Sequence, residues 1–284
     1  MRNLGLDLGG TNIKLALLED GTVIAQDETQ TGSGVEAVLD RMAELARRAG
    51  RVDTIGVALP GLFDDEGVAL LLPALDGWAG HPVRARLEER LARPVRLIND
   101  GHAFALAEST FGAGRGAENV MCIVCGTGIG GGLVLGGKLH LGPKQRAGEF
   151  GHHTVVQDGP RCECGNHGCL ELYAGARAIA AACGAATFDD AVAAAGAGDE
   201  RARRALADAG RLIGLALANV LIFVCPDRVV IGGGVAQAGD HLLEPLRVTV
   251  AERARVAPLD RIGINVAELG PRAGAVGAAL WGAV

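Results

Sequence analysis

Short apolar runs and helix-spaced apolar positions alternate along the chain. Residues 4–8 are a short apolar run broken by Asp7, and residues 14–18 and 22–29 are typical of two further strands joined by the Asp20-Gly21 turn, so the pattern predicts three strands in a meander. Residues 35–49 place apolar side chains three and four positions apart and end at Gly50, which predicts a helix. The same criteria predict the remaining elements of the first half, which are strands over 54–59 and 95–98 and helices over 83–91 and 103–111.

The second half begins with a similar cycle. A buried strand is predicted over 120–125 and a hairpin over 131–135 and 138–141, around the Gly136-Gly137 turn. After a loop rich in glycine and cysteine, the pattern predicts helices over 170–182, 188–195, 199–223, 242–254 and 273–283 and strands over 228–231 and 264–268. Two meanders, each opened by a glycine-bearing turn, favour an α/β fold of two lobes with an interlobe cleft.

The composition narrows the class of protein. The chain has 284 residues, 49% of them hydrophobic, with 44 glycines but only 3% aromatic residues. Such a core has to be built from Ala, Val, Leu and Ile packed against glycine backbone, as in α/β layers. The net charge is −6 and the pI is near 5.7. This acidic balance argues against a nucleic-acid partner and favours a small-molecule ligand.

The N-terminal sequence and the cysteine content predict the compartment. The chain starts Met1-Arg2-Asn3-Leu4 without a signal-like segment, and no run of 18 uninterrupted apolar residues offers a membrane span. We therefore expect a cytoplasmic protein with no membrane partner. In a reducing compartment, the cysteines inside apolar segments are ordinary buried thiols: Cys122, Cys125, Cys183 and Cys225.

Residues 148–171 hold the densest group of chemically active side chains. The four donors of a tetrahedral zinc site are available there: His152, Cys162, Cys164 and Cys169. Four protein ligands leave no position for a catalytic water, so the predicted zinc is structural. Glu149 and Glu171 flank the donors, and carboxylates in fixed positions are good partners for polyol hydroxyls. The alternatives are reduced thiols without metal, or disulfides of a secreted protein.

Three glycine loops follow predicted strands. In Asp7-x-Gly9-Gly10-Thr11, bare backbone and a hydroxyl suit phosphate oxygens, and the carboxylate suits a Mg²⁺ ion that bridges phosphates. Alone, this loop is as typical of a tight hairpin. Residues 126–131 (Gly-Thr-Gly-Ile-Gly-Gly) formally match a dinucleotide fingerprint, but a strand is predicted after them instead of a helix, so we reject NAD binding. Residues 232–234 are three glycines that permit a flat base or ribose to lie against backbone.

Asn99-Asp100 closes a buried strand where the next helix begins. A carboxylate at this place can accept the proton of a substrate hydroxyl that attacks phosphorus. It can equally serve as the N-cap of the helix predicted from Ala103, or do both.

These motifs, in this order and over essentially the whole chain, resemble those of the ROK sugar kinases, bacterial glucokinase-like members of the actin and hexokinase superfamily. The most specific part is the spacing Gly151-His152, nine residues, then Cys162-x-Cys164-Gly165-x-x-Gly168-Cys169-x-Glu171. The resemblance implies two ribonuclease-H-like, actin-like ATPase lobes. It places one small lobe over residues 1–107 and 273–284 and one large lobe, with the zinc loop, over 108–272.

The resemblance also implies an ATP-dependent hexokinase of the glucokinase type, with ATP, Mg²⁺ and structural Zn²⁺. Asp100 becomes the general base toward a hydroxyl, expected to be the 6-hydroxyl, of glucose or a related hexose. The implied sugar contacts are Gly61, Asn99, Asp100, Glu149, His152 and Glu171. The implied ATP and Mg²⁺ contacts are Asp7, Gly9, Gly10, Thr11, Asn12, Lys14, Gly126, Thr127, Gly128, Gly130, Gly233 and Gly234. His152 would use one ring nitrogen for zinc and the other for the sugar. A homodimer or homotetramer is expected.

Two alternatives stay open. Many members carry a polar residue, often Asn, where this chain has Ala74, so an amino sugar or a cyclitol competes with glucose as the substrate. The family also contains sugar-sensing transcriptional regulators, which carry an N-terminal helix-turn-helix. This chain reaches its first strand at Leu4 and is acidic, which favours the kinase. A catalytically dead sensor is disfavoured by the presence of Asp7, Asp100, Glu149 and Glu171.

Overall fold

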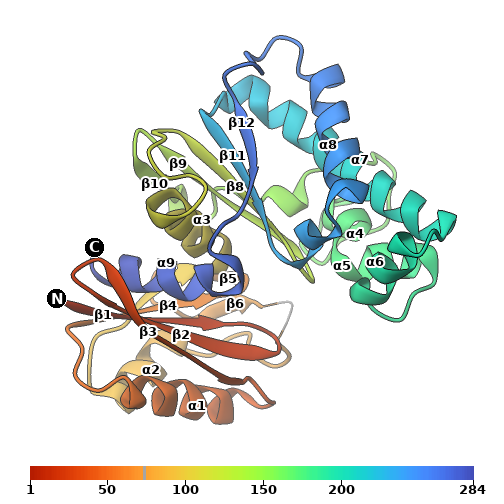
Figure 1. Ribbon diagram of the computed structural model, residues 1–284. Helices are drawn as coiled ribbons and strands as arrows, with labels where there is room; N and C mark the ends of the chain where they lie inside the picture. The colour runs from red at the N-terminus through yellow and green to blue at the C-terminus, as the bar shows by residue number, and fades with distance from the viewer. Residues whose placement is uncertain (73–74) are drawn as a thin grey trace. The chain divides into compact units, whose positions relative to one another are not determined.

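The computed structural model describes residues 1–72 and 75–284, which form two compact units (Figure 1). Unit 1 comprises Met1–Arg115, Leu139–Gly148 and Leu269–Val284, and unit 2 comprises Gly116–Lys138 and Glu149–Glu268. The lobe limits given by the resemblance stay a prediction. The hypothesis on Ala74 concerns a residue outside the described ranges.

Unit 1 is built on a mixed five-stranded sheet. Across the sheet the strands are β3 (Thr22–Gln30), β2 (Asn12–Glu19), β1 (Arg2–Leu8), β4 (Thr54–Leu59) and β7 (Arg96–Asn99). The first three form an antiparallel meander, and β4 and β7 run parallel to β1. A small hairpin of β5 (Leu62–Phe63) and β6 (Ala69–Leu71), which the sequence pattern does not predict, follows β4.

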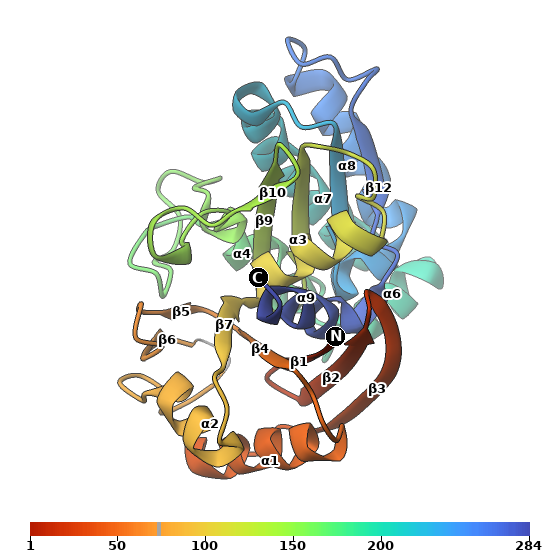
Figure 2. The same cartoon turned by 90° about the vertical axis from the view of Figure 1, so that its left-hand side faces the viewer.

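Helices cover both faces of this sheet. Figures 1 and 2 show α1 (Val35–Arg48) and α2 (Val83–Leu91) on one face and α9 (Ala273–Gly282) on the other. Helix α3 (Asp100–Phe111) packs against α9 so closely that a Cβ at Gly277 would lie 1.8 Å from the Ala103 carbonyl oxygen. The sheet approaches α9 just as closely, because a Cβ at Gly5 of β1 would lie 1.9 Å from the Ala275 oxygen. Glycine backbone therefore replaces aromatic bulk in this core, as the composition predicts.

Unit 2 repeats the same sheet topology. Its strand order is β10 (Lys138–His140), β9 (Ile129–Leu135), β8 (Val120–Cys125), β11 (Arg228–Gly232) and β12 (Gly263–Val266), with β9 antiparallel to β8 and the last two strands parallel to it. Its helices are α4 (Glu171–Ala174), α5 (Ala176–Cys183), α6 (Phe188–Gly196), α7 (Glu200–Val224) and α8 (Asp240–Arg253). The short 3-10 helices of the described chain are η1 (Pro143–Gln145), η2 (Phe150–His152), η3 (Gly234–Ala238) and η4 (Gly270–Arg272).

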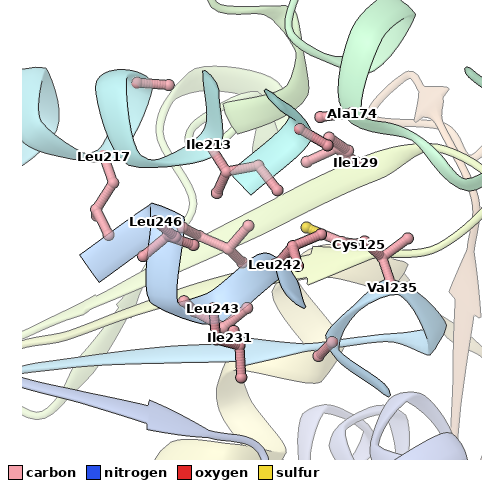
Figure 3. Close-up of a cluster of buried hydrophobic side chains, with 14 of the residues drawn as sticks. Cys125, Ile129, Ala174, Ile213, Leu217, Ile231, Val235, Leu242, Leu243 and Leu246 are labelled. Carbon is pink, nitrogen blue, oxygen red and sulfur yellow. The ribbon is translucent and has the colours of Figure 1, made fainter. Parts of the chain in front are cut away.

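Helix α7 passes the length and hydropathy criteria for a membrane span, but it is a core helix of unit 2. Ten of its residues are buried. Figure 3 shows Ile213 and Leu217 of α7 beside Leu242 and Leu246 of α8, with all four in one buried cluster. A Cβ at Gly210 would lie 2.2 Å from the Leu242 carbonyl oxygen, so the two helices are in direct contact. This packing accounts for the apolar character of α7 without a membrane.

Two helix boundaries differ from the pattern. Helix α3 starts at Asp100, three residues before the predicted start, because the Asn99 side chain accepts hydrogen bonds from the backbone N–H groups of Gly101 (2.8 Å) and His102 (3.2 Å) and caps the helix. The helix predicted over 170–182 is broken at Gly175, whose backbone is extended. There the Ala176 N–H donates to the Gly126 carbonyl (2.9 Å), a contact that the local sequence cannot reveal.

The Glu108 carboxylate of α3 is fully buried and accepts backbone hydrogen bonds from Ala113 (2.9 Å) and Leu269 (2.8 Å). We expect Glu108→Leu, which keeps the volume but leaves both N–H groups unpaired, to lower the free energy of unfolding by about 2–5 kcal/mol. Urea unfolding followed by circular dichroism measures this. The exposed Glu44→Leu on α1 is the control and should stay within about 0.5 kcal/mol of the parent. Equal values for both variants would contradict an anchoring role.

Candidate active site

The first glycine loop is the tight turn between β1 and β2. The Gly9 N–H donates to the Asn12 carbonyl (3.0 Å), and the Thr31 hydroxyl donates to the Gly9 carbonyl (2.6 Å). Gly10 and Thr11, at the tip of the turn, are exposed. The turn thus holds the predicted phosphate contacts Gly9 to Asn12 together and presents their backbone to solvent.

Asp7 lies directly before this turn, paired across the strands with Lys14. Helix α9 packs against its carboxylate, since a Cβ at Gly274 would lie 2.5 Å from Oδ2. Burial raises the pKa of Asp7 to about 6, although the positive charge of Lys14 lowers it. A carboxylate whose surroundings disfavour its negative charge is typical of a functional site. A bound cation would offset the free-energy cost of burying that charge.

Asp7→Asn should therefore stabilise the protein in the absence of nucleotide and Mg²⁺. The folded-state pKa lies above the unfolded value of 3.8, so the contribution of Asp7 to stability is present below pH 3.8 and is lost as the pH rises through about 6. We expect the substitution to raise the free energy of unfolding by about 1–3 kcal/mol at pH 8 and by much less at pH 4. Urea unfolding at both pH values, with the exposed Asp260→Asn as control, measures the difference. A gain that does not depend on pH would contradict the burial of the charge.

Three predicted sugar contacts lie together in unit 1. Asp100 is the first residue of α3 and Asn99 its N-cap, while the Asn99 amide donates to the Gly61 carbonyl (3.1 Å). Asn99 therefore takes the capping role that the sequence left open for Asp100. One Asp100 oxygen accepts from the Gly101 N–H (2.8 Å), so the carboxylate is held at the N-terminal end of α3. A carboxylate fixed in this way can accept a proton.

The other two glycine loops lie at one edge of the unit 2 sheet. Residues 126–128 follow β8 and Gly233-Gly234 follow β11, and these strands are parallel neighbours. Gly233 has a φ of 84°, and a Cβ there would lie 2.1 Å from the Cys125 carbonyl oxygen. The carboxyl edge of parallel strands is the usual ligand-binding edge of an α/β sheet. The structure thus brings together the second and third loops that the sequence singles out.

The candidate zinc ligands also converge in unit 2. One donor atom from each of His152, Cys162, Cys164 and Cys169 lies within 4.8 Å of all the others. The sulfurs of Cys164 and Cys169 are 3.7 Å apart, and the Cys162 sulfur is 3.7 Å from His152 Nδ1. Zinc–sulfur bonds of about 2.3 Å place the sulfurs of a tetrahedron about 3.8 Å apart, so the donor set fits zinc in chemistry and spacing.

At position 168 of this loop, glycine is required for steric reasons. Gly168 has a φ of 64°, and a Cβ there would lie 1.7 Å from the Val156 carbonyl oxygen. Next to it, the Cys162 N–H donates to the Asn166 carbonyl (2.7 Å), which closes the turn that carries Cys164. Since Nδ1 of His152 faces the thiols, its Nε2 is the nitrogen left for another partner.

A model of the ROK family matches residues 3–283 of this sequence. The chain belongs to the ROK family. The glucokinase of Halalkalibacterium halodurans is 33% identical to this ROK protein over 306 residues, which cover 96% of the chain and 92% of the relative. The N-acetyl-D-glucosamine kinase of Escherichia coli is 34% identical over 290 residues, which cover 88% and 93%.

Solved structures of the ROK family confirm the predicted α/β fold. A ROK glucokinase from Streptomyces griseus, in complex with glucose and AMPPNP, matches with a TM-score of 0.87 at 31% identity, covering 100% of this chain and 99% of that one. A ROK family transcriptional regulator, a homologue of the Escherichia coli MLC protein, matches with a TM-score of 0.84 at 28% identity, covering 99% of this chain and 78% of that one.

The ROK motifs do not include His102, a residue near the candidate base that the sequence pattern also missed. It is buried in α3, and its Nε2 lies 2.7 Å from the Ala147 carbonyl oxygen. Burial lowers the pKa of His102, so the ring is neutral at pH 7 and donates from Nε2 to that carbonyl. His102 thus ties the start of α3, two residues from Asp100, to the segment that leads to Glu149. The available signal was a histidine directly before the apolar run 103–107 of this helix.

Proposed function

We propose that this ROK protein is an ATP-dependent sugar kinase that transfers the γ-phosphate of ATP to a hydroxyl of glucose or a related hexose. The observation that carries this proposal is the Gly61, Asn99 and Asp100 group, in which a carboxylate is fixed at a helix N-terminus. Its support is the similarity of nearly the whole chain to a glucokinase and to an N-acetyl-D-glucosamine kinase. The 6-hydroxyl is the proposed acceptor.

In the proposed reaction, Asp100 removes the proton of the sugar hydroxyl as the hydroxyl oxygen attacks the γ-phosphorus. The new oxygen–phosphorus bond forms while the bond to the β-phosphate oxygen breaks, and ADP leaves. Little covalent chemistry is required of the protein, so catalysis depends on positioning and on neutralising charge. Asn99, bonded to the Gly61 carbonyl, caps the helix that Asp100 begins, and Glu149, His152 and Glu171 are proposed to bind further sugar hydroxyls.

The nucleotide is assigned to the glycine loops. The AMPPNP complex of the Streptomyces griseus relative supports ATP as the donor. The first loop, with Lys14, and residues 126–130 are proposed to bind the phosphates, and Gly233-Gly234 the nucleoside. Asp7 would hold Mg²⁺, which neutralises phosphate charge when bound. His152 and the three cysteines would hold a structural zinc that fixes the loop between Glu149 and Glu171.

The identity of the sugar is the finer part of the proposal. Glucose is one candidate, and the Escherichia coli relative makes an amino sugar a second. A cyclitol is a third, because Ala74 lacks the amide found in many members. Coupled measurement of ADP release across a panel of hexoses, amino sugars and cyclitols tests all three and ranks them by kcat/KM.

A sugar-sensing regulator is the competing function, supported by the likeness to the MLC homologue. The same assay separates the two functions, since a regulator binds sugar without consuming ATP. Sugar-dependent ADP release would support the kinase. Sugar binding without turnover, at any Mg²⁺ concentration, would favour the regulator.

A further inference from the structure

The carboxylate of Glu171 contacts the loop assigned to the phosphates. Its Oε2 accepts a hydrogen bond from the Ile129 N–H (2.7 Å), directly after Gly128. A Cβ added at Gly128 would lie 2.4 Å from the same oxygen and 3.2 Å from Cδ. The loop therefore packs onto this side chain so tightly that a Cβ at position 128 would have to displace the Glu171 carboxylate.

A second contact joins the same segments. The Ala176 N–H donates to the Gly126 carbonyl (2.9 Å), and a Cβ at Gly175 would lie 3.0 Å from the Thr127 carbonyl oxygen. Helix α4, which begins at Glu171, thus contacts the loop at both of its ends. Cys169, a candidate zinc ligand, lies only two residues before Glu171.

We infer that Glu171 couples sugar binding to the phosphate loop, so that sugar raises the affinity for nucleotide and nucleotide raises the affinity for sugar by the same factor. This inference rests on the proposed function. One carboxylate oxygen accepts from the Ile129 N–H. The other, which has no hydrogen bond to the described residues, is proposed to bind a sugar hydroxyl. A sugar that fixes this carboxylate also fixes the Ile129 N–H and the loop before it, which reduces the ordering cost when phosphates bind.

Gly128→Ala tests the coupling from the nucleotide side. The added methyl has to displace Glu171, so we expect the Kd for glucose, titrated calorimetrically without nucleotide, to rise about fivefold or more. Gly196→Ala on α6, outside the candidate site, is the control, because a Cβ there would meet no heavy atom of the described residues within 4 Å. It should keep the parent Kd for glucose within about twofold. Neither glycine has a positive φ that would itself strain alanine.

The parent gives the direct measure of the coupling. AMPPNP with Mg²⁺ should lower its Kd for glucose by about fivefold or more, and Gly128→Ala should reduce that factor to below about twofold. If Gly128→Ala binds AMPPNP less tightly but keeps the parent Kd for glucose and the parent coupling factor, the two sites are independent and the inference is wrong. If the parent does not bind glucose, N-acetylglucosamine is titrated instead. A parent that binds neither sugar would overturn the proposed function itself, before any variant is compared.

Glu171→Asp provides a second test if Gly128→Ala does not fold. The shorter side chain keeps the charge but withdraws the carboxylate from Ile129, so we expect the Kd for AMPPNP, measured without sugar, to rise about threefold or more. Zinc content equal to the parent's would show that the neighbouring cluster is intact. An unchanged Kd for AMPPNP in this variant would overturn the inference.

Discussion

Asp100→Asn should lower kcat by about 10²- to 10⁴-fold while keeping most of the affinity for sugar. An asparagine oxygen still accepts from the Gly101 N–H, as Asp100 does at 2.8 Å, so the start of α3 keeps its shape. The amide cannot take a proton from the sugar hydroxyl, and so the transition state loses its base. The measurement is steady-state ADP release with glucose, together with calorimetric Kd values for glucose in parent and variant.

Asp240→Asn is the matched control for this substitution. Asp240 is also the first residue of a helix, α8, and its side chain is 91% exposed. The control removes a charge from a helix N-terminus without touching the candidate site, so kcat should stay within about twofold of the parent. If Asp100→Asn turns over within threefold of the parent, the assignment of Asp100 as general base is wrong.

The regular elements could be predicted because the residues that start and end them are adjacent to them in the sequence. The helix over 83–91 and the strand over 120–125 have the predicted bounds, since proline precedes the first and turn residues flank the second. The start of α3 was missed because Asn99-Asp100-Gly101 is a polar sequence that resembles a loop, although Asn99 caps a helix there. The break at Gly175 was missed for a different reason, because it depends on the contact of the next residue, Ala176, with Gly126, 50 positions away.

The same distinction between local and distant contacts decides which of the functionally or structurally important residues could be predicted. The four candidate zinc donors could be singled out from the sequence because a histidine and three cysteines stand at a spacing typical of metal sites, and the structure brings them together. Glu108 and His102 could not, because their long-range partners are backbone groups 161 and 45 positions away. Any residue supplies such a backbone group, so no partner motif exists. The remaining signal was a charged or polar residue beside the apolar run 103–107, which predicts burial with a partner but does not identify it.

Cys164→Ser should abolish zinc binding and raise the Kd for glucose by about 10- to 100-fold, with a smaller effect on the Kd for AMPPNP. Cys164 is the exposed member of the cluster, so its replacement leaves no cavity in the core. Without the metal, three ligands no longer fix the loop, and Glu149 and Glu171, which flank it, lose their fixed positions. The effect on nucleotide is smaller because the Ala176–Gly126 backbone bond still holds the phosphate loop.

Metal analysis and calorimetry on one set of preparations test this prediction. The parent should hold about one zinc per chain, and Cys183→Ser is the control, since Cys183 lies on α5 outside the cluster and its sulfur donates to carbonyls of its own helix. That control should retain both the metal and the parent Kd for glucose. A metal-free parent with full sugar affinity would show that the four side chains are ordinary thiols and a histidine. If Cys164→Ser loses zinc but still binds glucose as the parent does, the loop is held by its backbone bonds, such as that from Cys162 to Asn166, and the ion does not position the carboxylates.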